Sequence, residues 1–153
     1  MNGVKIDRVL KNQIIYDLFE IHKERIIIGW LKKNGYEYIL KRIKILDSFG
    51  NGNYVLFSSE DQLKYIKSCI MEGEIPIIFH NHLYSEDYTF SDPDISFFNK
   101  FYNCYETLND NSILFAGLIN NENKTIQFMQ IMNNQLELGK IITLDEYREG
   151  SVL

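Results

Sequence analysis

The stretch Ile75–Ile95 reads IPIIFHNHLYSEDYTFSDPDI, and the prediction of the fold starts from it and extends to the sequence on both sides. Its first half is short and apolar, and a polar loop follows it, which is typical of a buried strand. Residues two apart on a strand share a face, so His80 and His82 present both imidazoles on one side. Ser91 and Asp94 follow in an S-x-x-D arrangement at the start of a helical pattern.

The flanking sequence predicts helices and strands in alternation. Before this stretch we expect a helix over 7–23, a hairpin of strands 25–31 and 36–46, a loop over 47–53, a short strand over 54–57 and a helix over 59–72. After it we expect a helix over 92–108, strands over 112–119 and 124–132 joined by a turn at 120–123, and a strand over 135–144. The pattern predicts an α/β fold with a mixed central sheet flanked by helices.

The length of 153 residues suits one domain over 1–153, with a polar, loosely held tail over 146–153. A net charge of -5 argues against a protein that coats nucleic acid, since phosphate binding leaves a basic footprint. Five basic residues lie close together in the predicted hairpin, and we interpret them as charges that keep an edge of the sheet soluble: Lys32, Lys33, Lys41, Arg42 and Lys44.

The two cysteines, Cys69 and Cys104, lie in no C-x-x-C pattern, so we expect free thiols rather than a disulfide or a thiolate zinc site. No apolar run has the length of a membrane span, and the N-terminus lacks the apolar core of a signal peptide. These features predict a cytoplasmic protein that does not enter a membrane. The sequence does not indicate an oligomeric state.

The histidines and the aspartate suggest metal chemistry. A catalytic zinc commonly has three ligands from histidine and carboxylate side chains, with a fourth position left for water or substrate. His80, His82 and Asp94 supply such a set if the strand end faces the helix start. Hydrolysis also needs a base that takes a proton from water and passes it to the leaving amine.

The pattern His80-x-His82, Ser91-x-x-Asp94 and an upstream glutamate resembles the signature of the JAMM (JAB/MPN) metalloproteases over about 6–132. The resemblance implies a three-layer arrangement like that of the cytidine deaminases, and zinc held by the two histidines and the aspartate. It also implies that Glu24 is the general acid/base and that Ser91 stabilises the oxyanion. The implied reaction is cleavage of a peptide or isopeptide bond, the latter at the tail of a ubiquitin-like protein.

The chain departs from the family pattern next to the second histidine. Leu83 stands where the family has proline, and the interval from His82 to Ser91 is one residue longer than usual. Ile26 and Ile27 replace small residues that the family has after the glutamate. These changes affect the loop and the packing, while every expected ligand is present.

Several alternatives stay open at the level of sequence. Glu20 lies one helical turn before Glu24 and is the other candidate base, while His22 is interpreted as a surface residue. Glu86 and Asp87 are interpreted as solvated loop carboxylates. The same fold without catalysis would serve as a binding or scaffold module. A role with DNA, as in RadC-like proteins, is a further alternative that the acidic net charge disfavours.

Overall fold

The structure is a computed structural model that describes residues 3–46, 48–49, 54–55 and 57–149. Its strands are β1 (Gly3–Ile6), β2 (Ile26–Asn34), β3 (Glu37–Leu46), β4 (Ser48–Phe49), β5 (Tyr54–Val55), β6 (Ile75–His82), β7 (Ile113–Asn120), β8 (Thr125–Met132) and β9 (Gln135–Thr143). Its helices are α1 (Arg8–Ile15), a π-helical turn (Tyr16–Glu20), α2 (Ser59–Glu72), α3 (Asp92–Leu108) and α4 (Leu144–Glu149).

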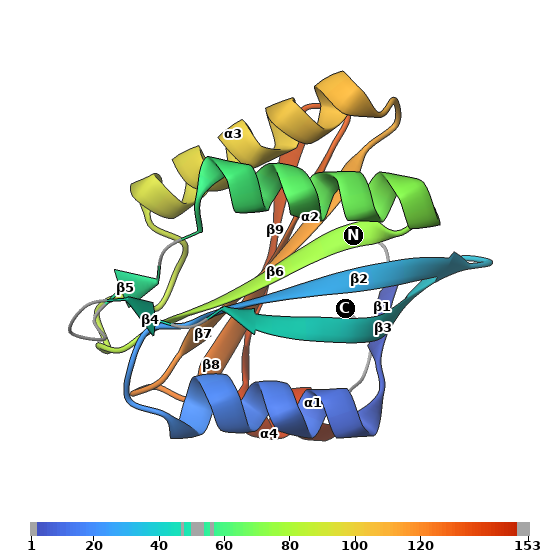
Figure 1. Ribbon diagram of the computed structural model, residues 1–153. Helices are drawn as coiled ribbons and strands as arrows, with labels where there is room; N and C mark the ends of the chain where they lie inside the picture. The colour runs from blue at the N-terminus through green and yellow to red at the C-terminus, as the bar shows by residue number, and fades with distance from the viewer. Residues whose placement is uncertain (1–2, 47, 50–53, 56, 150–153) are drawn as a thin grey trace.

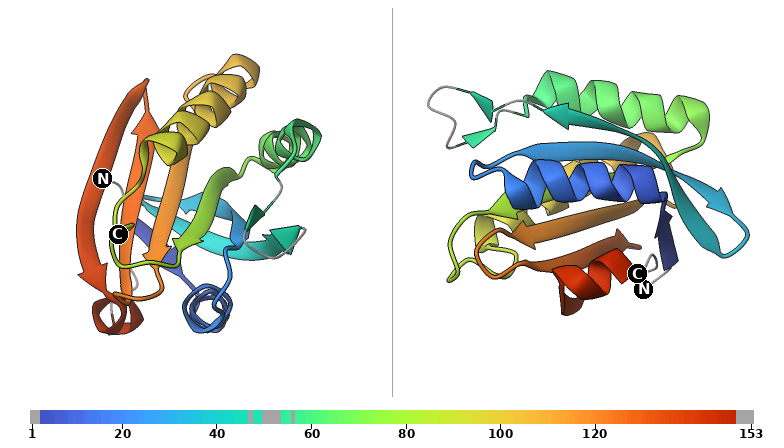
Figure 2. Two further views of the ribbon diagram at one scale, coloured as in Figure 1. Left: turned by 90° about the vertical axis from the view of Figure 1, so that its left-hand side faces the viewer. Right: turned by 90° about the horizontal axis from the view of Figure 1, so that it is seen from below.

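Within the described residues, seven strands form one mixed sheet in the order β1-β3-β2-β6-β7-β8-β9. The pairs β1–β3 and β6–β7 are parallel and the other neighbours are antiparallel. Helices α2 and α3 cover one face, and α1 and α4 cover the other (Figure 1). The sheet curls between these two layers (Figure 2). The α/β class with a mixed central sheet is therefore confirmed.

Two apolar clusters fill the spaces between the layers. One lies between the sheet and α1 and α4, and it contains Leu18, Phe79 and Tyr147. The other lies beneath α2 and α3, and it contains Ile78 and Phe98. Successive residues of β6 thus pack into opposite clusters, as the alternation of a strand requires. His80 and His82 share the face of Ile78, toward α2 and α3.

Most predicted elements are found close to their predicted bounds. Gly73 ends α2 with a φ of 65°, the left-handed conformation that glycine adopts readily at a helix C-terminus. The β2–β3 and β7–β8 hairpins are both present. Cys69 and Cys104 are free, as expected. None of the helices in the described ranges has the length and hydrophobicity needed to cross a bilayer.

Three local predictions were wrong. The first helix does not reach residue 23, because the π-helical turn ends at Glu20 and Ile21 is extended. Strand β1 is an additional element that the sequence analysis did not predict. Residues 48–49, which were predicted as loop, form strand β4, and β4 pairs with β5 of the predicted strand over 54–57. Residues 47, 50–53 and 56 of these two predicted segments lie outside the described residues.

The third correction concerns the tail. Residues 146–149 belong to α4, where Tyr147 is 3% exposed and Leu144 is 9% exposed, and both pack against the cluster under the sheet. The Lys11 ammonium donates a hydrogen bond to the Tyr147 carbonyl at 3.1 Å, which ties α4 to α1. Residues 150–153 lie outside the described part of the chain.

Candidate metal centre

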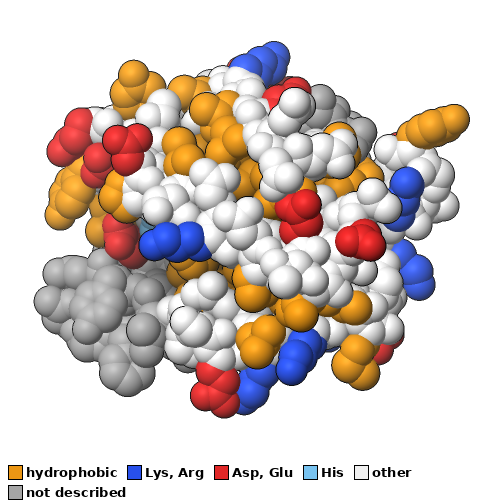
Figure 3. All heavy atoms as spheres, turned by 90° about the horizontal axis from the view of Figure 1, so that it is seen from above, with side chains coloured by type: hydrophobic (Ala, Val, Ile, Leu, Met, Phe, Trp, Pro, Cys, Tyr) orange, Lys and Arg blue, Asp and Glu red, His pale blue; other side chains and the backbone are white. Residues whose placement is uncertain are grey.

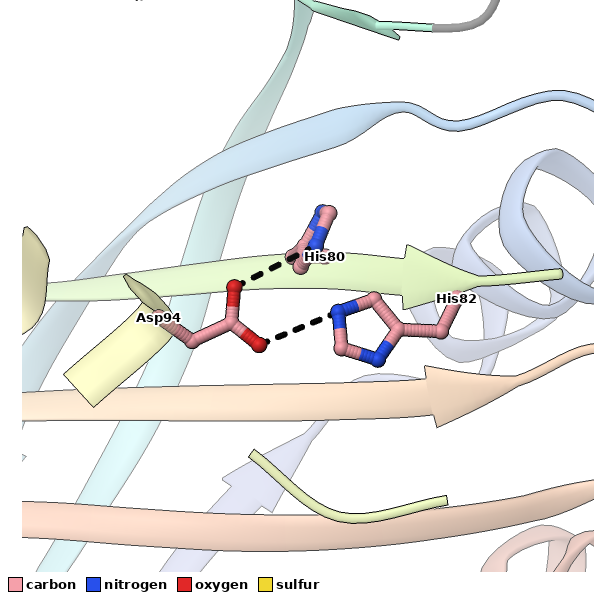
Figure 4. A group of neighbouring side chains, drawn as sticks. All are labelled: His80, His82 and Asp94. Atoms are coloured by element: carbon pink, nitrogen blue, oxygen red, sulfur yellow. Dashed lines mark ion pairs between the residues drawn. The ribbon is translucent and has the colours of Figure 1, made fainter. Parts of the chain in front are cut away.

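The end of β6 and the start of α3 bring three candidate ligands together. His80 and His82 project from the same face of β6 toward Asp94, which lies in the first turn of α3 (Figure 4). The Ser91 hydroxyl accepts a hydrogen bond from the Asp94 amide at 3.2 Å, and the Asp94 carboxylate accepts one from the Ser91 amide at 3.0 Å. This capping box starts the helix and fixes the direction of the Asp94 side chain.

The distances among the three side chains suit a metal ion. Nε2 of His82 lies 3.0 Å from Oδ2 of Asp94, and Nε2 of His80 lies 3.6 Å from Oδ1. One ligand atom from each residue falls within 4.8 Å of the others. Tetrahedral zinc ligands at bond lengths of about 2.0–2.1 Å stand about 3.3 Å apart. The two histidine–Asp94 distances of 3.0 and 3.6 Å are within a few tenths of an ångström of this value, while a pair of ligand atoms 4.8 Å apart would have to approach by about 1.5 Å. The three side chains therefore lie close enough to hold a metal ion.

Neighbouring groups orient both imidazoles. Nδ1 of His82 lies 3.0 Å from the carbonyl oxygen of Asp87, which favours a proton on Nδ1 and leaves the lone pair of Nε2 for a ligand. His82 is 10% exposed and His80 is 18% exposed at the side chain. Within the described residues, Nδ1 of His80 is buried without a hydrogen-bond partner. The pair is thus shielded from solvent and directed toward Asp94.

Burial and mutual contact shift the pKa values of the three groups. Burial lowers the pKa of His80 to about 4, although Asp94 opposes the shift. Burial alone would raise the pKa of Asp94, but the hydrogen bond with His82 and the charge of His80 outweigh it and bring that pKa to about 2. Burial also acts to lower the pKa of His82, but the contact with Asp94 raises it overall. Asp94 is therefore an anion near neutral pH, and His80 is neutral, as metal ligands must be.

Glu24 lies near this group, and Glu20 does not share its surroundings. Glu24 is half-buried in the segment that leads into β2. Burial raises its pKa, His82 partly reverses the shift, and Asp94 adds to it, so its carboxyl interacts electrostatically with the candidate ligands. The Glu20 side chain is 51% exposed, and its Oε1 lies 4.0 Å from the Arg148 guanidinium of α4. Of the two glutamates, Glu24 is therefore the one whose carboxyl interacts with the candidate ligands.

Asn81, between the two histidines, holds the backbone on both sides of Glu24. Its side chain faces the opposite side of β6 and is fully buried. Its Oδ1 accepts a hydrogen bond from the Arg25 amide at 2.6 Å, and its Nδ2 donates to the Lys23 carbonyl at 3.0 Å. The same Nδ2 donates to Oδ1 of Asn121 at 2.8 Å. One strand therefore carries the histidines on one face and a clamp for the glutamate segment on the other.

Asn121 and Asn120 extend this polar framework from the β7–β8 turn. The side-chain Nδ2 of Asn121 donates hydrogen bonds to the backbone carbonyls of Leu18, Phe19 and Ile21, at the end of the first helical segment. The side-chain Nδ2 of Asn120 donates hydrogen bonds to the backbone carbonyls of Tyr84 and Asp87 in the loop after β6, at 2.8 and 3.0 Å. Sequence reasoning assigned these asparagines only to a turn. Their role depends on the pairing of β6 with β7, which local sequence does not reveal.

The remaining predicted residues lie as follows. Ser91 is half-buried and caps α3 beside Asp94. His22 is exposed, in agreement with its prediction as a surface residue, and Glu86 and Asp87 are exposed in the loop. The basic cluster is partly engaged, because the Arg42 guanidinium stacks 4.1 Å from the Trp30 ring centroid and lies 3.3 Å from Glu74.

Comparisons with known proteins inform the fold alone. No family model and no curated protein matches the chain. The solution structure of protein DSY2949 from Desulfitobacterium hafniense is similar, with a TM-score of 0.54 at 13% identity over 92% of each chain. The N-terminal domain of STIL from Trichoplax adhaerens matches 84% of this chain and 40% of its own at 14% identity, but its TM-score of 0.33 supports no inference. The first likeness indicates a shared architecture and says nothing about activity.

Proposed function

We propose that the protein is a zinc-dependent hydrolase of the JAMM type that cleaves a peptide or isopeptide amide bond. The observation that carries the proposal is the convergence of His80, His82 and Asp94 beside a half-buried Glu24 whose pKa is raised. Three nitrogen and oxygen ligands leave a coordination position open, which is characteristic of catalytic rather than structural zinc sites.

Each side chain receives one role in this proposal. Zinc, when bound, supplies Lewis-acid chemistry that acidifies water and polarises a carbonyl. Glu24 takes the proton from the attacking water and delivers it to the leaving amine, and its raised pKa brings it closer to the working pH of a general base. The Ser91 hydroxyl accepts the Asp94 amide hydrogen and so keeps its own proton to donate to the developing oxyanion.

The substrate class follows from the resemblance to JAMM proteases. We propose a polypeptide amide as substrate, with the tail of a ubiquitin-like protein as one form of it. Nucleic acid is a weaker proposal, because the net charge is -5 and Arg42 of the basic cluster is already paired. Two free thiols, Cys69 and Cys104, are compatible with a reducing cytoplasm as the location.

The test compares amide hydrolysis by the zinc-loaded native protein with that of two matched variants. Glu24→Gln keeps the size of the side chain and removes the base, so we expect turnover to fall about 100-fold or more while zinc remains bound. Glu20→Gln makes the same chemical change four residues earlier, on an exposed side chain, and we expect native turnover. Equal turnover by native protein and Glu24→Gln on every substrate that is cleaved would refute the assigned mechanism.

A second candidate is a binding module without catalysis. The specific observation in its favour is that Asp94 already pairs with both imidazoles, so the three side chains partly satisfy one another without a metal. In that case the cluster stabilises the junction of β6 and α3. Background hydrolysis by the native protein across peptide and isopeptide substrates, together with absence of bound zinc, would favour this candidate over the hydrolase.

A further inference from the structure

A pocket of about 330 Å³ lies directly beside the candidate metal ligands. Its floor is the sheet, where β2 supplies Ile26 and β6 supplies Ile78. Its wall on one side is the first part of α3, with Phe97 and Phe98. Figure 3 views the molecule from the side of α2 and α3, where hydrophobic side chains lie among the surface atoms. The volume is at the lower end of the range for ligand pockets, about 300–1,000 Å³, and suits one large side chain rather than an extended ligand.

Aromatic packing gives the wall a defined shape. The Phe97 and Phe98 rings stand nearly perpendicular with centroids 5.2 Å apart, and Phe57 lies 6.2 Å from Phe97. On the α2 side, the Gln62 side-chain Nε2 donates a hydrogen bond to the Phe57 carbonyl at 2.8 Å, which engages one of its two N–H groups. Among the described residues, Asp94 is the carboxylate that lines the pocket, and no lysine, arginine or glutamate does so. Away from His80, Asp94 and Gln62 the lining is apolar, and that part of the pocket favours an apolar group over a charged one.

The polar end of the pocket consists of metal-centre residues. His80 and Asp94 line it together with the apolar residues. A polypeptide whose scissile carbonyl faces these ligands therefore has a side chain of an adjoining residue next to the apolar lining. This contiguity argues for a part of the substrate as the occupant, because an unrelated ligand in the pocket would obstruct the centre.

We propose that this pocket binds a bulky apolar side chain, such as phenylalanine or leucine, on the substrate residue next to the scissile amide. The inference rests on the proposed hydrolase function and narrows its substrate class, because glycine at that position leaves the pocket empty. Complete burial of a large apolar side chain is expected to strengthen binding about thirty-fold, which corresponds to about 2 kcal/mol.

The binding test uses two amides that differ in one side chain. N-acetylphenylalanine amide and N-acetylglycine amide are titrated separately into the zinc-loaded protein and into the zinc-free protein, and binding is followed by NMR chemical shifts. The pocket predicts that the phenylalanine amide binds about thirty-fold more tightly and shifts the signals of Ile78 and Phe97 in both forms. Comparable binding of the two amides, or shifts confined to other parts of the molecule, would overturn the proposal.

Two substitutions on α2 separate pocket filling from general disturbance. Gln62→Phe places a ring at the pocket wall, and we expect it to weaken binding of the phenylalanine amide about ten-fold or more. Leu63→Phe adds a ring at the next position, which is 37% exposed and outside the lining, and we expect native binding. Thermal unfolding of both variants verifies that they fold. Equal binding by the native protein and a folded Gln62→Phe would refute the assignment.

Hydrolysis distinguishes failure of the pocket from failure of the enzyme. Cleavage that is equally fast for matched peptides with phenylalanine or glycine beside the scissile bond refutes the pocket and leaves the hydrolase standing. Selective binding of the phenylalanine amide at Ile78 and Phe97 without cleavage of any peptide supports the pocket and refutes the hydrolase. NMR contacts between the pocket and one of the protein's own segments, in place of the amide, would also refute the pocket as a substrate site.

Discussion

Replacing Asn81 with alanine removes the clamp on the segment that carries Glu24. Among the described residues, the side chain makes three hydrogen bonds of 3.0 Å or less, to the Arg25 backbone amide, the Lys23 carbonyl and the Asn121 side chain. Its own polar atoms are fully buried, and a buried partner left without a hydrogen bond costs about 1 kcal/mol or more. We therefore expect Asn81→Ala to lower the free energy of unfolding by about 3 kcal/mol, measured by urea denaturation of the zinc-free protein.

Hydrogen exchange tests whether the loss is local to the clamp. The Arg25 amide should exchange faster in Asn81→Ala, because its acceptor is gone. Asn81→Asp keeps an acceptor for that amide and replaces the donor to Lys23, so it should be destabilised while the Arg25 amide stays protected. Asn99→Ala, at an exposed position of α3, should change stability by less than about 0.5 kcal/mol. Unchanged stability or unchanged exchange at Arg25 in Asn81→Ala would refute this reasoning.

Three further predictions concern packing and charge. Gly117→Ala should cost about 1–3 kcal/mol in urea denaturation, because the added Cβ would stand 2.7 Å from Cδ1 of the buried Phe79 ring. As the pH falls from about 6.5 to about 4, the zinc-free native protein should lose more free energy of unfolding than His80→Asn. In this range His80 binds a proton in the unfolded chain, but in the folded protein burial holds its pKa at about 4 and the imidazole stays neutral. Tyr147→Phe should leave thermal stability unchanged or raise it, because the Tyr147 hydroxyl is buried without a hydrogen-bond partner in the described residues. Deletion of the chain from Leu144 onward should lower thermal stability, because it exposes the apolar cluster between the sheet and α1.

The sequence predicted the parts of the molecule that depend on neighbouring residues. The strand before His82 and the helix after Ser91 were identified from alternation and from a capping pattern, both of which are local. Because a strand places residues two apart on one face, the shared direction of the histidines also followed from sequence. The approach of Asp94 to the histidines came from the family resemblance, and the structure brings these residues together.

Features that depend on distant residues were not predicted. Strand β1 is stabilised by parallel pairing with β3, more than thirty positions away, and four residues carry too little pattern to identify a strand alone. The amphipathic pattern suggested a helix as far as residue 23, but Asn121 binds the carbonyls at the end of the helical segment from a distant turn. Helix α4 was predicted as a polar tail because its buried residues are only Leu144, which was assigned to the preceding strand, and Tyr147.

Zinc analysis of the purified protein tests the proposed metal centre most directly. The protein is equilibrated with zinc, dialysed, and measured by elemental analysis beside His82→Ala, Asp94→Ala and His22→Ala. We predict about one zinc per chain in the native protein and in His22→Ala, whose side chain is exposed, and a loss of most of it in the other two variants. Less than about a tenth of an equivalent in the native protein, or retention of full zinc content by His82→Ala and Asp94→Ala, would contradict the assignment of this centre.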